Sequence, residues 1–268
     1  MKPLILIRGG GDLASGVALR LHRVGFQVAI LELPAPLSVR RTVSFSEAVY
    51  EGHITVEDVT ARLVSADQLQ DALDVGEIPV LVDPEANILH NQLVTSPQFT
   101  YLVDARLLKK QIEPLDIKLP VHIGLGPGFT AGGNCHAVIE TRRSHTLGRV
   151  IWEGEAQADS GQPEGDPRRV LRAPGNGNIL SIKSIGDHVE EGEPIATLND
   201  VSITSPMSGV LRGLIHPKAE VSKGIKIGDV DPRDEPEACF LVSDKALAIG
   251  GGVLEAILVI SKDLNKEN

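Results

Sequence analysis

The sequence predicts an α/β protein built on a mainly parallel sheet, with a second, smaller all-β region inserted into it. Two observations support the sheet: short apolar runs alternate with helical patterns, and a glycine-rich turn follows the first run directly. A third observation, an internal repeat beyond residue 165, supports the β region. The apolar runs expected to form buried strands are residues 4–7, 28–31, 79–83, 101–104, 121–125, 136–140 and 149–152.

The first strand leads into a turn typical of nucleotide-binding folds. Gly9, Gly11 and Ala14 occupy the small-residue positions of the G-x-G-x-x-G/A fingerprint. An amphipathic helix and a second strand follow, and this strand ends at Glu32, about 20 residues on, where such folds place a ribose-binding acid. The pattern predicts a Rossmann-like fold; the alternative is a glycine-rich turn that binds nothing. The candidate ligand-binding residues here are Gly9, Gly10, Gly11, Asp12, Ser15 and Glu32.

Other polar groups are expected at the same edge of the sheet. Acidic residues end several apolar runs, and ligands bind beyond the carboxyl ends of strands in open α/β sheets. A second glycine-rich turn spans residues 124–133, and two arginines follow Glu32. The acids serve as ligand contacts or as helix caps, and the arginines clamp a phosphate or pair with a glutamate. The further candidates are Arg40, Arg41, Asp83, Asp104, Gly126, Gly128 and Glu140.

Candidates for covalent or metal chemistry are few. Cys135 follows the second glycine turn, where a thiol acts as a nucleophile or sulfur carrier if its pKa is lowered; the alternative is a small buried side chain. The histidines show no metal-binding spacing, so we predict no metal site, and whether the protein is an enzyme stays open. Capping-box patterns predict helix starts at Ser44, Thr55 and Ser65.

The region beyond the polar linker at residues 159–167 contains two similar halves. Gly177, Val189 and Gly192 align without gaps on Gly209, Val221 and Gly224. Such halves resemble the biotinyl/lipoyl-type barrel-sandwich domain, but residues 198–203 lack the attachment lysine, so no covalent biotin or lipoyl is expected. The tail is helical, with three glycines at 250–252 that imply close packing, a kink or a ligand. We predict an α/β domain (1–165), a barrel-sandwich domain (166–235) and a helical segment (236–268) packing back on the sheet.

Composition limits the partners. The net charge of −10 and an aromatic content of 3% argue against nucleic acid and anionic membrane surfaces. No apolar run reaches the roughly 18 residues that span a bilayer, and no secretory pattern is found, so we expect a soluble, cytoplasmic protein. Formation of a homo-oligomer stays open.

Several motifs together resemble the YqeB family of selenium-dependent molybdenum hydroxylase system proteins. They lie at residues 7–16, 40–48, 138–141, 147–151 and 251–257. The resemblance implies an accessory or maturation factor whose partner is an apo molybdenum hydroxylase. The glycine turn is also similar to that of the XdhC accessory proteins, which makes molybdenum cofactor (molybdopterin) the candidate phosphate-bearing ligand. The alternatives are an NAD-dependent oxidoreductase and a nucleotide-binding sensor or scaffold.

Overall fold

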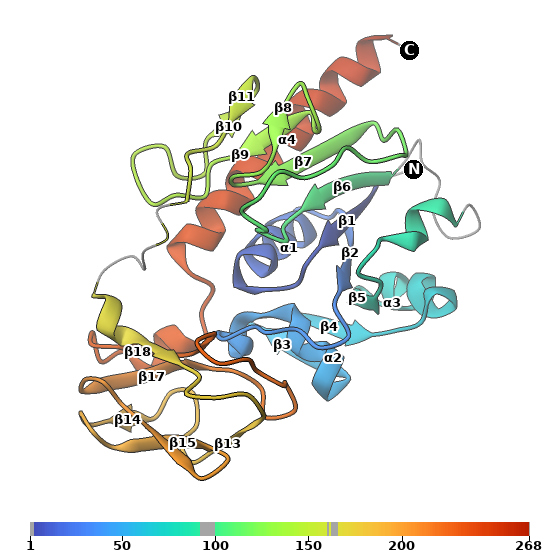
Figure 1. The fold of residues 1–268 in the computed structure, drawn as a ribbon. Coiled ribbons are helices and arrows are strands. Elements are labelled where there is room, and N and C mark those ends of the chain that lie inside the picture. Colours follow the sequence, from blue (N-terminus) through green and yellow to red (C-terminus); the bar gives the residue numbers. More distant parts are fainter. Residues whose placement is uncertain (1–2, 92–99, 160, 162–165, 268) are drawn as a thin grey trace.

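The computed structural model describes residues 3–91, 100–159, 161 and 166–267. Its centre is a nine-stranded sheet (Figure 1). Pairing between neighbours is parallel except at the two edges, where one hairpin partner and one short strand run antiparallel. The predicted α/β class with a mainly parallel sheet is therefore confirmed. In spatial order the strands are β10 (Val150–Ile151), β9 (Ala137–Ile139), β7 (Val121–Leu125), β6 (Thr100–Asp104), β1 (Leu4–Arg8), β2 (Gln27–Glu32), β5 (Ile78–Val82), β4 (Val59–Leu63) and β3 (His53–Val56).

Helices cover both faces of the sheet. Because side chains alternate along a strand, Ile5 and Ile7 of β1 pack with α1 (Asp12–Arg23) and α4 (Asp244–Glu267) on one face. Leu6 points to the other face and packs in a cluster with Leu69 of α3 (Leu69–Asp74). Figure 1 shows α1 and α4 on the same side of the sheet. A fourth helix, α2 (Ala48–Glu51), precedes β3.

The C-terminal helix passes through its three glycines without a break. A Cβ on Gly250 would lie 2.8 Å from the carbonyl oxygen of Gly16 in α1, and one on Gly252 would lie 2.1 Å from that of Gly148. Of the three explanations that the sequence allows, the structure supports close packing. Helix α4 lies against the sheet, in contact with α1, β7, β9 and β10.

One of the three predicted helix starts is wrong and one is confirmed. Thr55 lies in β3, which pairs antiparallel with β4 because the β-branched residues on both sides of a tight turn favour a hairpin. The Ser65 capping box with Gln68 is present at the start of a 3-10 turn. The Ser44 hydroxyl caps no helix and donates to the Arg40 carbonyl oxygen instead.

The strands beyond residue 166 follow the internal repeat. Val189 pairs with Gly209, and Val221 pairs with Gly177, which is the same pairing with the two halves exchanged. Gly192 and Gly224 both adopt positive φ angles, 83° and 84°. The repeat thus encodes two similar halves related by strand exchange. One sheet contains β12 (Val170–Arg172), β18 (Lys226–Asp231), β17 (Gly209–Leu214) and β14 (His188–Val189); the other contains β13 (Ile179–Ser181), β15 (Pro194–Leu198) and β16 (Val201–Thr204).

This β unit has a hydrophobic cluster of its own, which draws on residues from Leu171 to Cys239. It lies below the sheet in Figure 1. The proposed domain bounds stay a prediction, and linker residues 160 and 162–165 lie outside the described part of the chain. A two-stranded sheet of β8 (Thr130–Ala131) and β11 (Gly154–Glu155) completes the strands. Among the described residues, no helix is both long enough and apolar enough to cross a bilayer.

Candidate functional site

The glycine turn after β1 is bonded to Glu32 at the end of β2. The Gly10 N–H donates to Glu32 Oε2 at 2.6 Å, and the Leu33 N–H donates to Oε1 at 2.6 Å. Glu32 is 7% exposed, and burial raises the pKa of its carboxyl group. Both carboxylate oxygens of Glu32 therefore already accept hydrogen bonds from backbone N–H groups in this structure.

A later segment lies directly over the same turn. The Ser46 N–H donates to the Gly10 carbonyl oxygen at 2.9 Å, and the Phe45 N–H donates to Ser15 Oγ at 2.8 Å. Ser15 Oγ in turn donates to the Gly10 carbonyl oxygen at 3.2 Å. A Cβ at Gly10 would lie 2.9 Å from the Ser46 nitrogen, so glycine is needed for this close approach. The space over Gly10 is thus filled by the chain itself.

The first turn of α1 is more open. Gly11 precedes the helix as its N-cap and provides no side-chain cap. The nearest atom to a Cβ at Gly11 would be Ser38 Oγ, at 3.7 Å. The first N–H groups of a helix have no partner within the helix and carry a partial positive charge. The start of α1 therefore favours an anion.

Arg40 lies beside this helix start and is buried. It is 7% exposed, and its Nη2 donates to the carbonyl oxygens of Ala238 and Leu241 at 3.2 and 3.0 Å. Its Nη1 lies 3.6 Å from Asp12 Oδ2, which is beyond hydrogen-bond distance, and neither Nε nor Nη1 has a hydrogen-bond partner in the described structure. Burial, and then the neighbouring Arg212, lower the pKa of Arg40. The guanidinium thus has two buried nitrogens without a hydrogen bond, and one of them, Nη1, forms an ion pair with Asp12.

Arg41 binds other partners than Arg40 does, one of them in the β unit. Its Nε donates to the Leu214 carbonyl oxygen at 3.0 Å, and its Nη1 donates to Glu47 Oε1 at 2.9 Å. These contacts join the two parts of the chain. In this structure the two neighbouring arginines do not form a single clamp.

Glu47, Glu51 and His216 form a group whose ligand atoms all lie within 4.8 Å of one another. His216 Nε2 lies 2.8 Å from Glu51 Oε1, while its Nδ1 accepts from the Lys218 N–H at 3.1 Å. An Nδ1 that accepts leaves the proton on Nε2, so Nε2 donates to Glu51 and has no lone pair for a metal ion. This geometry favours a hydrogen-bonded contact between the α/β region and the β unit over a metal centre.

The other predicted acids do lie at the carboxyl edge of the sheet, where they bind their own loops. Asp83 accepts from the backbone N–H groups of Asn87 and Ile88. Asp104 accepts hydrogen bonds from Nε and Nη2 of the Arg106 guanidinium. Glu140 accepts from the N–H groups of Arg142 and Gln157. Each acid therefore performs the capping or loop-closing role that was its alternative, and a ligand role for it stays a prediction.

The second glycine turn has its own neighbours. A Cβ on Gly126 would lie 2.6 Å from Thr141 Oγ1, and one on Gly128 would lie 2.2 Å from the Lys110 carbonyl oxygen. Cys135 is 8% exposed, and burial raises the pKa of its thiol to about 11. At neutral pH this thiol is protonated, which is unfavourable for a nucleophile.

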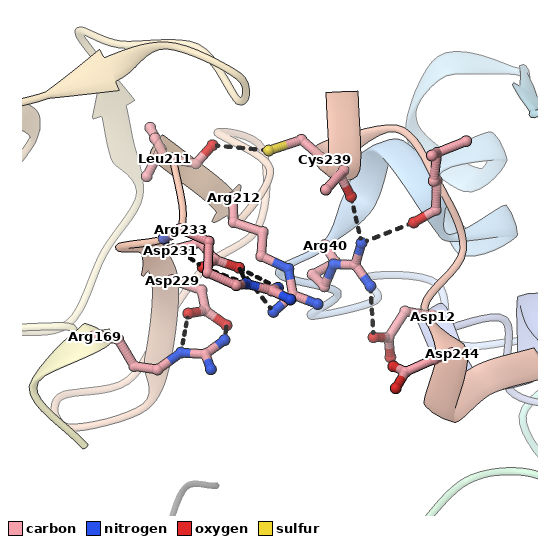
Figure 2. A network of polar contacts seen from close by, with 12 residues as sticks. Asp12, Arg40, Arg169, Leu211, Arg212, Asp229, Asp231, Arg233, Cys239 and Asp244 are labelled. Carbon is pink, nitrogen blue, oxygen red and sulfur yellow. Dashed lines mark hydrogen bonds and ion pairs between the residues drawn. The ribbon is translucent and has the colours of Figure 1, made fainter. Parts of the chain in front are cut away.

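Arg212 of β17 is the residue that sequence reasoning missed. Its side chain is 15% exposed, lies near Arg40 and forms an ion pair with Asp231 at 3.7 Å, and its Nε has no hydrogen-bond partner among the described residues (Figure 2). The repeat holds a signal for it, because Arg212 occupies the position of Leu180 in the first half. One half carries a charge where the other is apolar.

The comparisons with known proteins give one relative and no family model. No family model matches the chain. The uncharacterized protein YqeB of Escherichia coli (strain K12) is 47% identical over 262 residues, which cover 96% of this chain and 48% of YqeB. The chain is a homologue of YqeB. It spans about half the length of that curated relative.

Similar solved structures share little with the chain. The product-bound ectoine utilization protein EutE (DoeB) from Ruegeria pomeroyi has a TM-score of 0.23 at 10% identity, over 85% of this chain and 57% of that one. An aspartoacylase family protein from Mesorhizobium loti has 0.24 at 11%, over 86% and 85%. A succinylglutamate desuccinylase/aspartoacylase from Rhodobacter sphaeroides has 0.26 at 14%, over 85% of each. Such low scores carry no functional conclusion.

Proposed function

We propose that this chain binds a phosphate-bearing ligand where the start of α1 meets Arg40, and that it acts as an accessory factor in the maturation of a molybdenum hydroxylase. The binding part rests on one observation: Arg40 is 7% exposed, yet its Nε and Nη1 have no hydrogen-bond partner in the described structure. A buried, unsatisfied charged group costs free energy. A phosphate beside the helix start would accept from Nη1, the nitrogen that faces Asp12 of that helix.

The maturation role comes from the likeness to YqeB-family proteins, supported by 47% identity to YqeB itself. Molybdopterin is the candidate ligand because it carries a phosphate, and an apo molybdenum hydroxylase is the candidate partner. The mainly parallel sheet, in which the central strand β1 leads directly into the glycine turn, supports the predicted Rossmann-like crevice.

The geometry favours a compact phosphate over NAD. A dinucleotide would need Glu32 for a ribose hydroxyl, but both oxygens of Glu32 already accept backbone N–H groups. Ser46 also lies over Gly10, where the pyrophosphate of a dinucleotide would lie. We therefore expect NADH fluorescence to stay unchanged when the protein is added at micromolar concentration.

The test is mass spectrometry of small molecules released when protein purified from a molybdenum-replete host is denatured. We expect a pterin or its breakdown product from the wild type and its loss in Arg40→Gln. The matched control is Arg20→Gln, at the exposed far end of α1, which should retain the ligand. Release of an adenine dinucleotide, or equal retention by Arg40→Gln, would contradict the proposal.

A further inference from the structure

Two arginines from different parts of the chain meet at this site. Arg40 precedes a 3-10 turn of the α/β unit (Arg41–Val43), and Arg212 lies in β17 of the β unit. Figure 2 shows their guanidinium groups close together, between the two units. Arg212 is the strongest nearby charge that lowers the pKa of Arg40, so the two cations repel each other. Two like charges in a largely buried position destabilise a protein unless an anion neutralises them.

The acids around these two arginines make their hydrogen bonds to other residues and contact Arg40 and Arg212 only through longer ion pairs. Asp229 binds Arg169 through two hydrogen bonds of 2.8 and 2.9 Å. Asp231 binds Arg233 through bonds of 3.0 and 2.6 Å, and its Oδ2 lies 3.7 Å from Arg212 Nη1.

Asp12 is the remaining acid, at 3.6 Å from Arg40 Nη1. Both distances are those of ion pairs and are longer than a hydrogen bond. The charges of Arg40 and Arg212 are therefore partly compensated, but Nε of each arginine and Nη1 of Arg40 have no hydrogen-bond partner in the described structure.

We propose that Arg40 and Arg212 jointly bind one phosphate monoester dianion, which closes the β unit onto the α/β unit. This inference rests on the proposed phosphate site. It adds Arg212 as a second binding residue and specifies the charge of the ligand. Two guanidinium groups match the two charges of a monoester at neutral pH, whose second pKa lies near 6. A phosphodiester has one charge, so it would leave one of the two guanidinium charges without a match.

Arg40 has a second role in this closure. Through Nη2 it holds the carbonyl oxygens of Ala238 and Leu241, in the segment that leads from the β unit to α4. Thr42 Oγ1 donates to the Cys239 carbonyl oxygen at 2.6 Å in the same segment. A phosphate that binds both arginines would therefore tie together β17, the start of α1 and the return of the chain to the sheet.

The test is isothermal titration of the full chain with methyl phosphate and dimethyl phosphate at low ionic strength and pH 7.5. Wild type should bind the monoester and not the diester, and its affinity should rise between pH 5.5 and 7. Arg212→Gln should weaken monoester binding by about tenfold to a hundredfold, the effect of losing one charged hydrogen-bond partner. Arg172→Gln, an exposed residue of the same β unit, should leave binding unchanged.

Asp12→Asn provides a test that misfolding cannot imitate, because it should tighten monoester binding by removing a competing carboxylate. If Arg40→Gln loses binding while Arg212→Gln and Asp12→Asn both match the wild type, the joint site is refuted and the proposed function stands. If both esters bind equally, the dianion assignment is refuted. If wild type binds neither ester, the proposed phosphate site fails and this inference fails with it.

Discussion

A single methyl group in α4 should reveal how closely this helix packs. Gly252→Ala would place a Cβ 2.1 Å from the Gly148 carbonyl oxygen and 3.1 Å from Ile139 Cγ2. Both are fixed parts of the structure, a loop backbone and a sheet side chain. Overpacking of this kind costs about 1–3 kcal/mol. The helix-propensity gain of alanine over glycine, about 1 kcal/mol, offsets only part of that cost.

The neighbouring glycine provides the matched control. A Cβ at Gly251 would have no atom within 4 Å, so Gly251→Ala should gain the propensity of about 1 kcal/mol without a clash. Counting the propensity gain in both variants, Gly251→Ala should be more stable than Gly252→Ala by about 1–3 kcal/mol.

Urea unfolding followed by far-ultraviolet circular dichroism measures this difference. For a protein of this size, 1 kcal/mol corresponds to roughly 2–4 °C in melting temperature, so thermal unfolding gives an independent value. Equal stabilities for the two variants would show that α4 does not approach Gly148 closely, and close packing would then be the wrong explanation for the three glycines.

Three further results are expected. Burial lowers the pKa of His122 to about 4. On acidification the unfolded chain therefore binds a proton at this residue near pH 6.5, whereas the folded protein binds it only near pH 4. As the pH is lowered from 6.5 to 4, the free energy of unfolding should therefore fall by up to about 1.4 kcal/mol per pH unit. In urea titrations His122→Gln should show a weaker pH dependence of this free energy. A variant with the same pH dependence as the wild type would contradict the prediction. Cys135 should react with a disulfide reagent at pH 7.5 only as the protein opens, and a fast burst of labelling would contradict its raised pKa. Zinc should leave the melting temperature unchanged because His216 Nδ1 accepts a backbone N–H; a rise that is lost in His216→Asn would show a metal centre.

The sheet was predictable because its signals are local. Most of the parallel strands are short apolar runs, and the turn after β1 needs glycine for its positive φ at Gly9, 93°. The exception is β4, which pairs parallel with β5 but contains Thr60 and Arg62 and was not predicted. Thr55 shows the limit of such reasoning. A hydroxyl three residues before an acid fits a helix cap, but the β-branched residues around it pair across a hairpin, and this pairing decides the structure.

The sequence predicted where the residues of the candidate site lie, but it did not predict their hydrogen-bond partners. Sequence patterns placed Glu32, Asp104 and Glu140 at one edge of the sheet, where the structure has them. Which groups those acids bind depends on loops that fold back from elsewhere in the chain, such as the Gln157 N–H that donates to Glu140. The position of an acid at the end of a strand can thus be predicted from local sequence. The group that binds the acid depends on the tertiary structure.

The two halves of the β unit show where a sequence signal for function was hidden. Positions kept in both halves, such as Gly192 and Gly224, are turn residues with positive φ, so the need to fold explains them. Leu180 and Arg212 differ because their surroundings differ: Leu180 is 69% exposed, whereas Arg212 faces Arg40 of the α/β unit. Arg212 forms an ion pair with Asp231 at 3.7 Å, yet its Nε has no hydrogen-bond partner among the described residues. The proposed phosphate would bind this arginine as well as Arg40, and it would account for a charge in only one of the two halves.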